Sequence, residues 1–221
     1  DELVQAVSHE LGSPLSRLRF HLELLEDSTA AKRAERAQAI ARELDALDEL
    51  VAELLDCVQS GDVELDRQSF DPKAGLADLG ELVRFEAPDP ERVDVRLRVA
   101  ADVVIFADQR LFLRAIENLM RNAVRHADRQ VLIELTKASE QVCVAVHDDG
   151  PGIPEALRDN VMLPFARVEA ERSRAAGGLG LGLAIVDRIA QRHGGRVVIG
   201  TSPLGGASVT TWWDASAPSV R

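Results

Sequence analysis

The sequence predicts two domains within 221 residues, a helical hairpin followed by a two-layer α/β sandwich. Residues 1–60 contain two runs in which apolar side chains recur at alternating steps of three and four, as in helices that pack together. Beyond residue 70, strictly alternating segments and short apolar runs indicate strands interspersed with helices. Residues 61–69 are mostly polar and are typical of a linker. We therefore expect domains at 1–60 and 70–216.

The two apolar runs of the first domain extend over residues 7–25 and 37–58. The polar stretch 26–29 predicts a turn, so the two helices should form an antiparallel hairpin. One hairpin has too little core to stand alone, whereas two copies would complete a four-helix bundle. We therefore expect a homodimer through this domain.

His9 and Glu10 lie on the first helix of this hairpin, with Pro14 just beyond them. At helical spacing His9 points roughly 165° away from the apolar seam, so it should face solvent. Pro14 lacks an amide hydrogen and crowds the carbonyl of Glu10, which predicts a bend beside His9. A solvated histidine on an ordinary kinked helix is the alternative interpretation.

The second domain contains ten predicted elements in a mixed order. Their order indicates a mostly antiparallel sheet with the helices on one face. We expect helices at 74–85, 109–126 and 181–193, a short helix after Pro154, and strands at 93–99, 103–106, 131–137, 141–147, 196–200 and 207–213. The last two strands should pair across a turn at 203–206.

Composition excludes several classes of protein. The net charge of -11 disfavours a nucleic-acid partner, because such a surface repels phosphates. No apolar run approaches the roughly 18–20 residues that cross a bilayer. The two cysteines lack metal-ligand spacing, which indicates a reducing compartment. The chain begins at Asp1 inside a helical pattern, so we expect a cytoplasmic fragment whose membrane segments lie outside it.

Two clusters of side chains suggest a nucleotide site. Asn118 and Asn122 are four residues apart on one helix face, and their amide oxygens suit Mg²⁺. Arg125 and His126 are adjacent, and an arginine can hold phosphate oxygens. The second cluster begins with Asp148, a carboxylate that can accept a hydrogen bond from an exocyclic amine. Taken alone, the first cluster favours a polar solvent face over a nucleotide site, and the second would be an unremarkable turn.

Two further stretches suggest a phosphate-binding loop. The segment 177–183 is rich in glycine and leads into a helix, whose exposed amides can bind an anion. It lacks the Gly-Lys-Ser/Thr ending of a Walker A loop, and no strand leads into it. Phe165 and Arg167 place an apolar anchor and a cation in the long loop before it, which is typical of a lid.

The order and spacing of these stretches resemble the cytoplasmic core of bacterial two-component sensor histidine kinases, over nearly the whole chain. The amino-acid sequences of these stretches are most similar to those of envelope-stress and acid-response sensors of proteobacteria. The matching stretches are the phosphoacceptor box at 9–15, the N box at 118–123, the G1 box at 148–153, the F box at 164–165 and the G2 box at 178–183.

The resemblance implies a Bergerat-type (GHKL) ATP-binding fold for the second domain, with ATP and Mg²⁺ as cofactors. Asn122 would ligate Mg²⁺ and Asp148 would bind the adenine amino group. The remaining cofactor-binding residues would be Asn118, Arg125, His126, Gly150, Gly152, Phe165, Arg167, Gly178, Leu179, Gly180, Leu181 and Gly182.

The resemblance also implies the reaction. His9 would attack the γ-phosphate with Glu10 as general base, and the phosphoryl group would pass to an aspartate of a response-regulator receiver domain. Ser13 stands where the family usually has Thr or Asn, and its hydroxyl would serve a regulator phosphatase activity. The full-length protein would lie in the bacterial inner membrane.

Two other functions fit these residues less well. An ATPase or chaperone-like clamp without a histidine acceptor would not need the heptad hairpin or its outward His-Glu pair. A non-catalytic dimeric scaffold with a decayed nucleotide domain would not need Asn122, Asp148 and the intact glycine set.

Overall fold

The computed structural model describes residues 64–85, 91–100, 103–166 and 180–216, together with 15–24 and scattered positions between 12 and 47. Residues 15–23 are helical, as predicted. In the single chain, Leu18 is buried, whereas Leu15, Leu22 and Leu44 are each about half exposed. The described positions between 32 and 47 are helical too, and those from 37 onward fall in the predicted second helix, whereas Pro14, the turn at 26–29 and residues 48–60 lie outside the described residues. Within the described part of the chain, no helix is long and apolar enough to cross a membrane.

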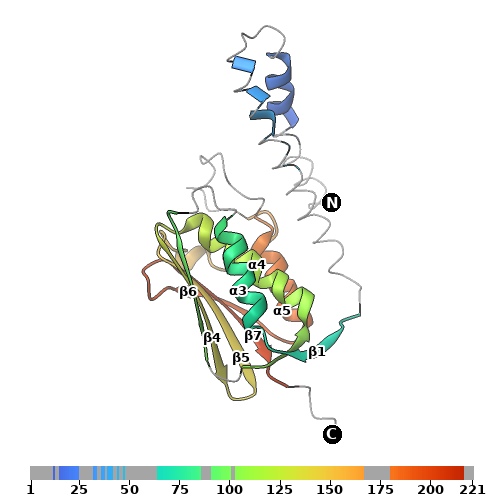
Figure 1. Ribbon diagram of the computed structural model, residues 1–221, viewed down its shortest axis with the longest axis vertical. Coiled ribbons are helices and arrows are strands. Elements are labelled where there is room, and N and C mark those ends of the chain that lie inside the picture. The colour runs from blue at the N-terminus through green and yellow to red at the C-terminus, as the bar shows by residue number, and fades with distance from the viewer. Residues whose placement is uncertain are drawn as a thin grey trace.

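The second domain is a two-layer α/β sandwich, as the sequence predicts. Its five-stranded sheet has the order β2-β4-β5-β7-β6, and Figure 1 shows helices α3, α4 and α5 on one face of it. Strand β2 runs parallel to β4, and every other neighbouring pair in this sheet is antiparallel. The strands are β2 (Asp94–Val99), β4 (Gln130–Ala138), β5 (Gln141–Asp148), β6 (Val197–Thr201) and β7 (Ala207–Asp214).

Alternation of side chains explains the central strands. In β4, Val131, Ile133 and Leu135 are buried toward the helices, while Leu132 and Glu134 are only half-buried on the opposite face. Such period-two patterning fixes the register, because a slip by one residue would expose the apolar set. The β4–β5 hairpin turns at Ser139, which adopts a positive φ of 56°. Strands β6 and β7 pair with each other across the turn at 203–206, as expected.

Helix α4 (Gln109–His126) matches the predicted helix at both ends. Asp108 caps it, because its side chain accepts a hydrogen bond from the Leu111 amide. Its apolar face packs against the sheet, and the Phe112 ring lies edge-to-face with those of Trp213 and Phe70, at centroid distances of 4.9 and 5.5 Å. The other long helices are α3 (Lys73–Phe85) and α5 (Gly182–Arg192), and two 3-10 turns, η1 (Glu155–Leu157) and η2 (Asn160–Met162), follow β5.

The entry of the chain into this domain differs from the sequence expectation. We predicted a linker over 61–69 and a strand at 103–106, whereas the structure forms β1 (Arg67–Phe70) and β3 (Ile105–Asp108). These strands pair with each other in a separate antiparallel sheet. Residues 67–69 are all polar and therefore show no apolar alternation. The strand thus extends into the predicted linker, because β3 supplies its backbone partners.

Candidate functional site

Asp148 ends strand β5 beneath the helices and is only 5% exposed. Its Oδ1 accepts hydrogen bonds from the backbone amides of Gly150, at 2.9 Å, and Ala207, at 3.0 Å. Burial raises the pKa of this carboxyl, while the two amides and nearby His126 oppose that rise. No hydrogen bond to its Oδ2 is found among the described residues. The site therefore offers a fixed, largely buried oxygen as an acceptor.

Glycines make this arrangement possible at two positions around Asp148. A Cβ at Gly150 would overlap the backbone carbonyl oxygen of His126, at the end of α4. A Cβ at Gly206 would overlap both the Asp148 carboxylate and the Gly150 amide. Gly152, the other glycine that we predicted here, adopts a positive φ of 73°. The loop after β5 can therefore approach the end of α4 only with glycine at position 150, and the 203–206 turn can approach Asp148 only with glycine at position 206.

Asp149, next to Asp148, has a separate task that the sequence analysis missed. Its carboxylate accepts hydrogen bonds from the backbone amides of Asp128, Arg129 and Gln130, at 2.9 to 3.1 Å, in the loop between α4 and β4. Burial alone would raise its pKa, but these amides outweigh burial and hold the pKa below its usual value. Asp149 thus fixes the end of α4 beside Asp148.

The predicted polar residues of α4 divide between two sides of the helix. Asn118, Asn122 and His126 are half-buried along one flank, at successive steps of four. The Asn118 amide nitrogen donates to the Arg114 carbonyl at 2.9 Å, which orients its Oδ1 away from that carbonyl. Arg125 is exposed on the outer side. The structure therefore brings the two asparagines and His126 together and leaves Arg125 toward solvent.

The residues on either side of the predicted lid segment are hydrogen-bonded to each other. The Phe165 amide donates to the Gly180 carbonyl at 3.0 Å, and both residues have a positive φ, of 64° and 72°. A side chain at Gly180 would overlap the Ala166 carbonyl. Leu181, which follows, is fully buried. This contact joins the two ends of the segment 167–179, and Arg167, Gly178 and Leu179 lie outside the described residues.

Helix α5 begins at Gly182, directly beside α4. A Cβ at Gly182 would lie 3.4 Å from the Asn118 Oδ1, so the first turn of α5 lies against the asparagine flank of α4. The N-cap residue, Leu181, has no side-chain hydrogen bond to the first turn. The first amides of α5 therefore have no side-chain cap from Leu181, which suits an anion.

The donor set near these asparagines suits a cation held mainly by a ligand. No group of three or more His, Cys, Asp or Glu side chains in the described ranges is arranged to hold a metal ion. A half-buried amide oxygen such as that of Asn122 is a hard ligand, and Mg²⁺ commonly takes one or two protein oxygens plus phosphates and water. The residues present therefore fit a Mg²⁺ ion that arrives with a nucleotide.

A cavity of about 430 Å³ lies elsewhere, between the end of α3 and the start of β2. None of the predicted site residues lines it. Its lining residues are Arg84, Phe85, Glu91, Arg92, Val93 and Asp94.

Of the predicted catalytic residues, His9, Glu10 and Ser13 all lie outside the described residues. The predicted nucleotide residues that are described come from α4, from the loop after β5, and from the start of α5. Apart from Arg125, which faces solvent, the structure thus gathers them at the helix-covered face of the sheet, although they are spread over 65 positions of sequence.

Two family models match the chain. The model of the histidine kinase-, DNA gyrase B- and HSP90-like ATPases matches residues 107–217, and that of the His Kinase A (phospho-acceptor) domain matches residues 1–62. Sensor protein RstB of Escherichia coli K12 is 35% identical over 213 residues, which cover 96% of this chain and 48% of RstB. Sensor histidine kinase CpxA of the same strain is 29% identical over 224 residues, covering 95% and 46%. The chain spans about half the length of these relatives.

Solved structures are similar as well. Full-length ShkA, crystallised in complex with AMPPNP, superposes with a TM-score of 0.70 at 25% identity, over 100% of this chain and 47% of ShkA. The histidine kinase AdeS of Acinetobacter baumannii has a TM-score of 0.74 at 21% identity, over 95% of this chain and 98% of that one. The AdeS likeness shows the shared fold.

Proposed function

Since this chain belongs to the family of histidine kinase-, DNA gyrase B- and HSP90-like ATPases, we propose that it is the kinase core of a two-component sensor. It transfers the γ-phosphoryl group of ATP to His9 and then to an aspartate of a response-regulator receiver domain. The observation that carries the proposal is the buried Asp148 carboxylate, fixed through Oδ1 and surrounded by obligatory glycines.

Asp148 accounts for recognition of adenine. Its Oδ2 accepts a hydrogen bond from the exocyclic amine of adenine. Burial strengthens this hydrogen bond because water cannot compete for the carboxylate oxygen. Gly150 and Gly152 let the backbone approach the planar ring. His126, which opposes the rise in the pKa of Asp148, is the last residue of α4. It packs beside the nucleotide.

The phosphates lie toward the asparagine flank of α4 and the start of α5. Asn122 ligates Mg²⁺, which neutralises phosphate charge when bound, and Asn118 lies beside it. The first amides of α5 face the phosphates. Arg125 and Arg167 supply positive charge from the helix and the lid, while Phe165 and the glycines at 178, 180 and 182 shape the hinge of the lid. Leu179 and Leu181 flank that hinge.

His9 is the nucleophile. Its ring nitrogen forms a bond to the γ-phosphorus as the bond from that phosphorus to the β,γ-bridging oxygen breaks, and ADP departs with the electron pair. Glu10 takes the proton of the imidazole, so that the attacking nitrogen keeps a lone pair. The match of residues 1–62 to the phospho-acceptor model supports these roles.

The first domain, residues 1–60, pairs with a second copy of itself. Half-exposed Leu15, Leu22 and Leu44 support this assembly, because a helical hairpin needs an apolar partner for such residues. A phosphatase activity through Ser13 and an inner-membrane location for the full-length protein stay predictions.

Labelling with γ-³²P-ATP and Mg²⁺ tests the proposal. We expect acid-labile, alkali-stable label on the unsubstituted chain and none on His9→Gln, which should still bind ATP in a calorimetric titration. His21→Gln, in the same predicted helix, is the matched control and should be labelled normally. Full labelling of His9→Gln would remove the nucleophile assigned here, and acid-stable label would indicate a different acceptor type.

A further inference from the structure

Asp108 binds two segments at the point where the chain enters the second domain. Its Oδ1 accepts the Leu111 amide in the first turn of α4, at 3.2 Å. Its Oδ2 accepts the amide of Asp66, the residue before β1, at 3.3 Å. The same residue pairs with Arg67 in the β1–β3 ladder. Asp108 is only 4% exposed. Its carboxylate thus connects the chain that enters the domain to helix α4, which carries the asparagine flank.

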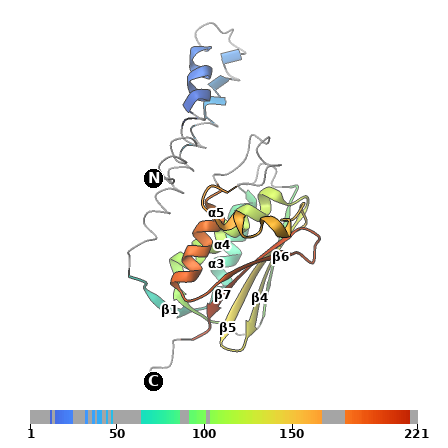
Figure 2. The same cartoon turned by 180° about the vertical axis from the view of Figure 1, so that it is seen from behind.

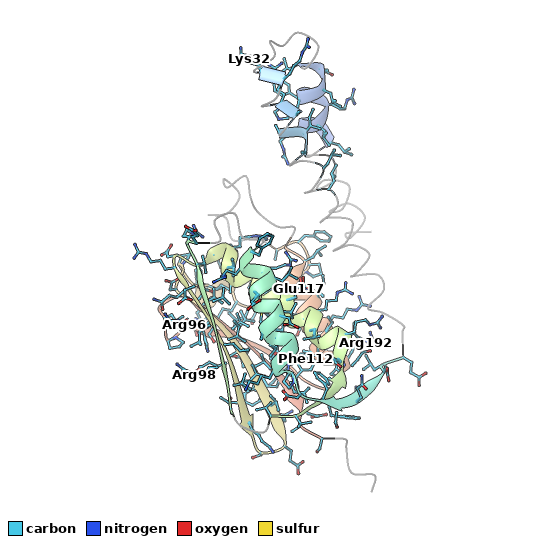
Figure 3. The ribbon with its side chains drawn as sticks, viewed as in Figure 1. Lys32, Arg96, Arg98, Phe112, Glu117 and Arg192 are labelled. Carbon is cyan, nitrogen blue, oxygen red and sulfur yellow. The ribbon has the colours of Figure 1, made fainter. Side chains whose placement is uncertain are left out.

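Arg67 makes a second connection, to the end of α5. Its Nη2 donates to the carbonyl oxygen of Arg192, the last residue of that helix, at 2.7 Å. The last carbonyls of a helix lack partners within it, so a guanidinium there satisfies one and complements the helix dipole. Figures 1 and 2 both place β1 beside this end of α5, and Figure 3 shows Arg192 on that side of the domain.

His193 completes the cluster by joining α5 to the start of α4. Its Nε2 accepts the Asp108 amide at 3.1 Å, and its Nδ1 lies 2.8 Å from the Ile189 carbonyl. Because a carbonyl only accepts, Nδ1 carries the hydrogen and Nε2 is left as the acceptor. The ring is 3% exposed and lies edge-to-face with Trp213, at a centroid distance of 5.4 Å.

This cluster lies at one end of the two helices whose other parts approach the nucleotide. Helix α5 runs from His193 back to Gly182 beside Asn118, and α4 runs from Asp108 toward His126. We propose that Arg67 and Asp108 are positioning residues for phosphoryl transfer. They fix the orientation at which the chain from the phosphoacceptor region enters the ATP-binding domain. The proposal rests on the proposed function, because it concerns the step between ATP and His9.

Fixed entry matters because the donor and the acceptor belong to different domains. The rate depends on how often the γ-phosphate reaches in-line geometry with His9, which falls as the domain samples more orientations. Loosening β1 from α5 widens this sampling without altering any nucleotide contact. The expected signature is therefore a lower turnover of bound ATP at unchanged ATP affinity.

Three single variants of the 221-residue chain test this. Arg67→Met keeps the aliphatic stem and loses the donor, Arg67→Lys restores a donor, and Arg96→Met removes an exposed arginine whose partner, Asp94, lies on the sheet edge. Figure 3 shows Arg96 on the sheet, far from the cluster. We expect Arg67→Met to slow autophosphorylation at saturating ATP by about three- to tenfold. Its ATP dissociation constant should stay within about twofold of the unsubstituted value. Arg67→Lys should recover most of the rate, and Arg96→Met should match the unsubstituted chain.

Two results would overturn the positioning role. The first is an unchanged rate for Arg67→Met. The second is a loss of ATP affinity well beyond twofold, or a loss of rate that Arg67→Lys does not restore, since either indicates general damage to the fold. Failure of the proposed function is distinguishable, because then the unsubstituted chain itself would show no histidine labelling.

Discussion

Exchanging Asp148 for asparagine should lower the affinity for ATP by about 10- to 100-fold while leaving the fold intact. The exchange keeps the side-chain oxygen that accepts the Gly150 and Ala207 amides. It replaces the second oxygen, Oδ2, by an NH₂ group. A donor would then face the exocyclic amine of adenine, which is also a donor.

The magnitude follows from the burial of this carboxylate. A hydrogen bond to a charged, buried acceptor contributes about 1.5–3 kcal/mol, and each 1.4 kcal/mol corresponds to a tenfold change in the dissociation constant. Because residue 148 is 5% exposed, water cannot replace the lost acceptor. The loss of ATP affinity should therefore lie toward the upper part of the 10- to 100-fold range.

The assay compares ATP with inosine triphosphate by titration calorimetry. The inosine ring carries an oxygen where adenine carries its amine, so the unsubstituted chain should bind ATP far more tightly. Asp148→Asn should narrow or reverse this preference, because its NH₂ group can donate to that oxygen. Loss of affinity for both nucleotides alike would indicate collapse of the pocket, which the melting temperature would reveal.

Asp149→Asn is the matched control, since it makes the same exchange at the next residue. Asp149 binds the amides of Asp128, Arg129 and Gln130 and has no assigned contact with the nucleotide. It should lower the free energy of unfolding by about 1–2 kcal/mol and leave the choice between ATP and inosine triphosphate unchanged. If Asp148→Asn retains ATP affinity and preference within about twofold, Asp148 does not bind adenine.

Two other predictions concern stability. Gly150→Ala should lower the free energy of unfolding by about 2 kcal/mol or more, because its Cβ would overlap the His126 carbonyl; Gly200→Ala, where nothing lies within 4 Å, should cost under about 1 kcal/mol, and equal urea midpoints would contradict this. Burial chiefly lowers the pKa of His193, with Arg67 and Arg192 adding to the fall and Ile189 and Asp108 opposing it. The unfolded chain therefore binds more protons below about pH 6.5, and stability should fall there as the pH drops until the lowered pKa is reached. His193→Gln should lose that part of the slope in urea unfolding, and an identical slope would refute the assignment.

The sequence predicts the parts of this fold in which side-chain periodicity and secondary structure coincide. Helix α4 has its expected bounds because its apolar spacing and the Asp108 cap agree. Strand β1 was missed because residues 67–69 are polar and each residue of the strand pairs with a residue of β3 that lies 35 to 41 positions away. Short-range spacing contains no information about such a partner.

The same limit applies to the site. Asp148 and the glycines around it follow from a motif whose residues are adjacent in sequence. The Asp149 clamp joins residues about 20 positions apart, and the Asp108–His193 bond spans 85 positions, so neither is visible before the chain folds. Gly206, which lies against Asp148, comes from the β6–β7 turn and was identified only as a turn residue.

The most direct measurement is to incubate the chain with ATP and Mg²⁺ and map the modified residue by mass spectrometry under alkaline conditions that preserve phosphohistidine. We predict a single phosphorylated peptide that contains residues 9–15, with the phosphoryl group on the His9 ring. Phosphate on another residue, or ATP hydrolysis with no phosphorylated peptide, would contradict the central claim that the ATP-binding domain acts on His9.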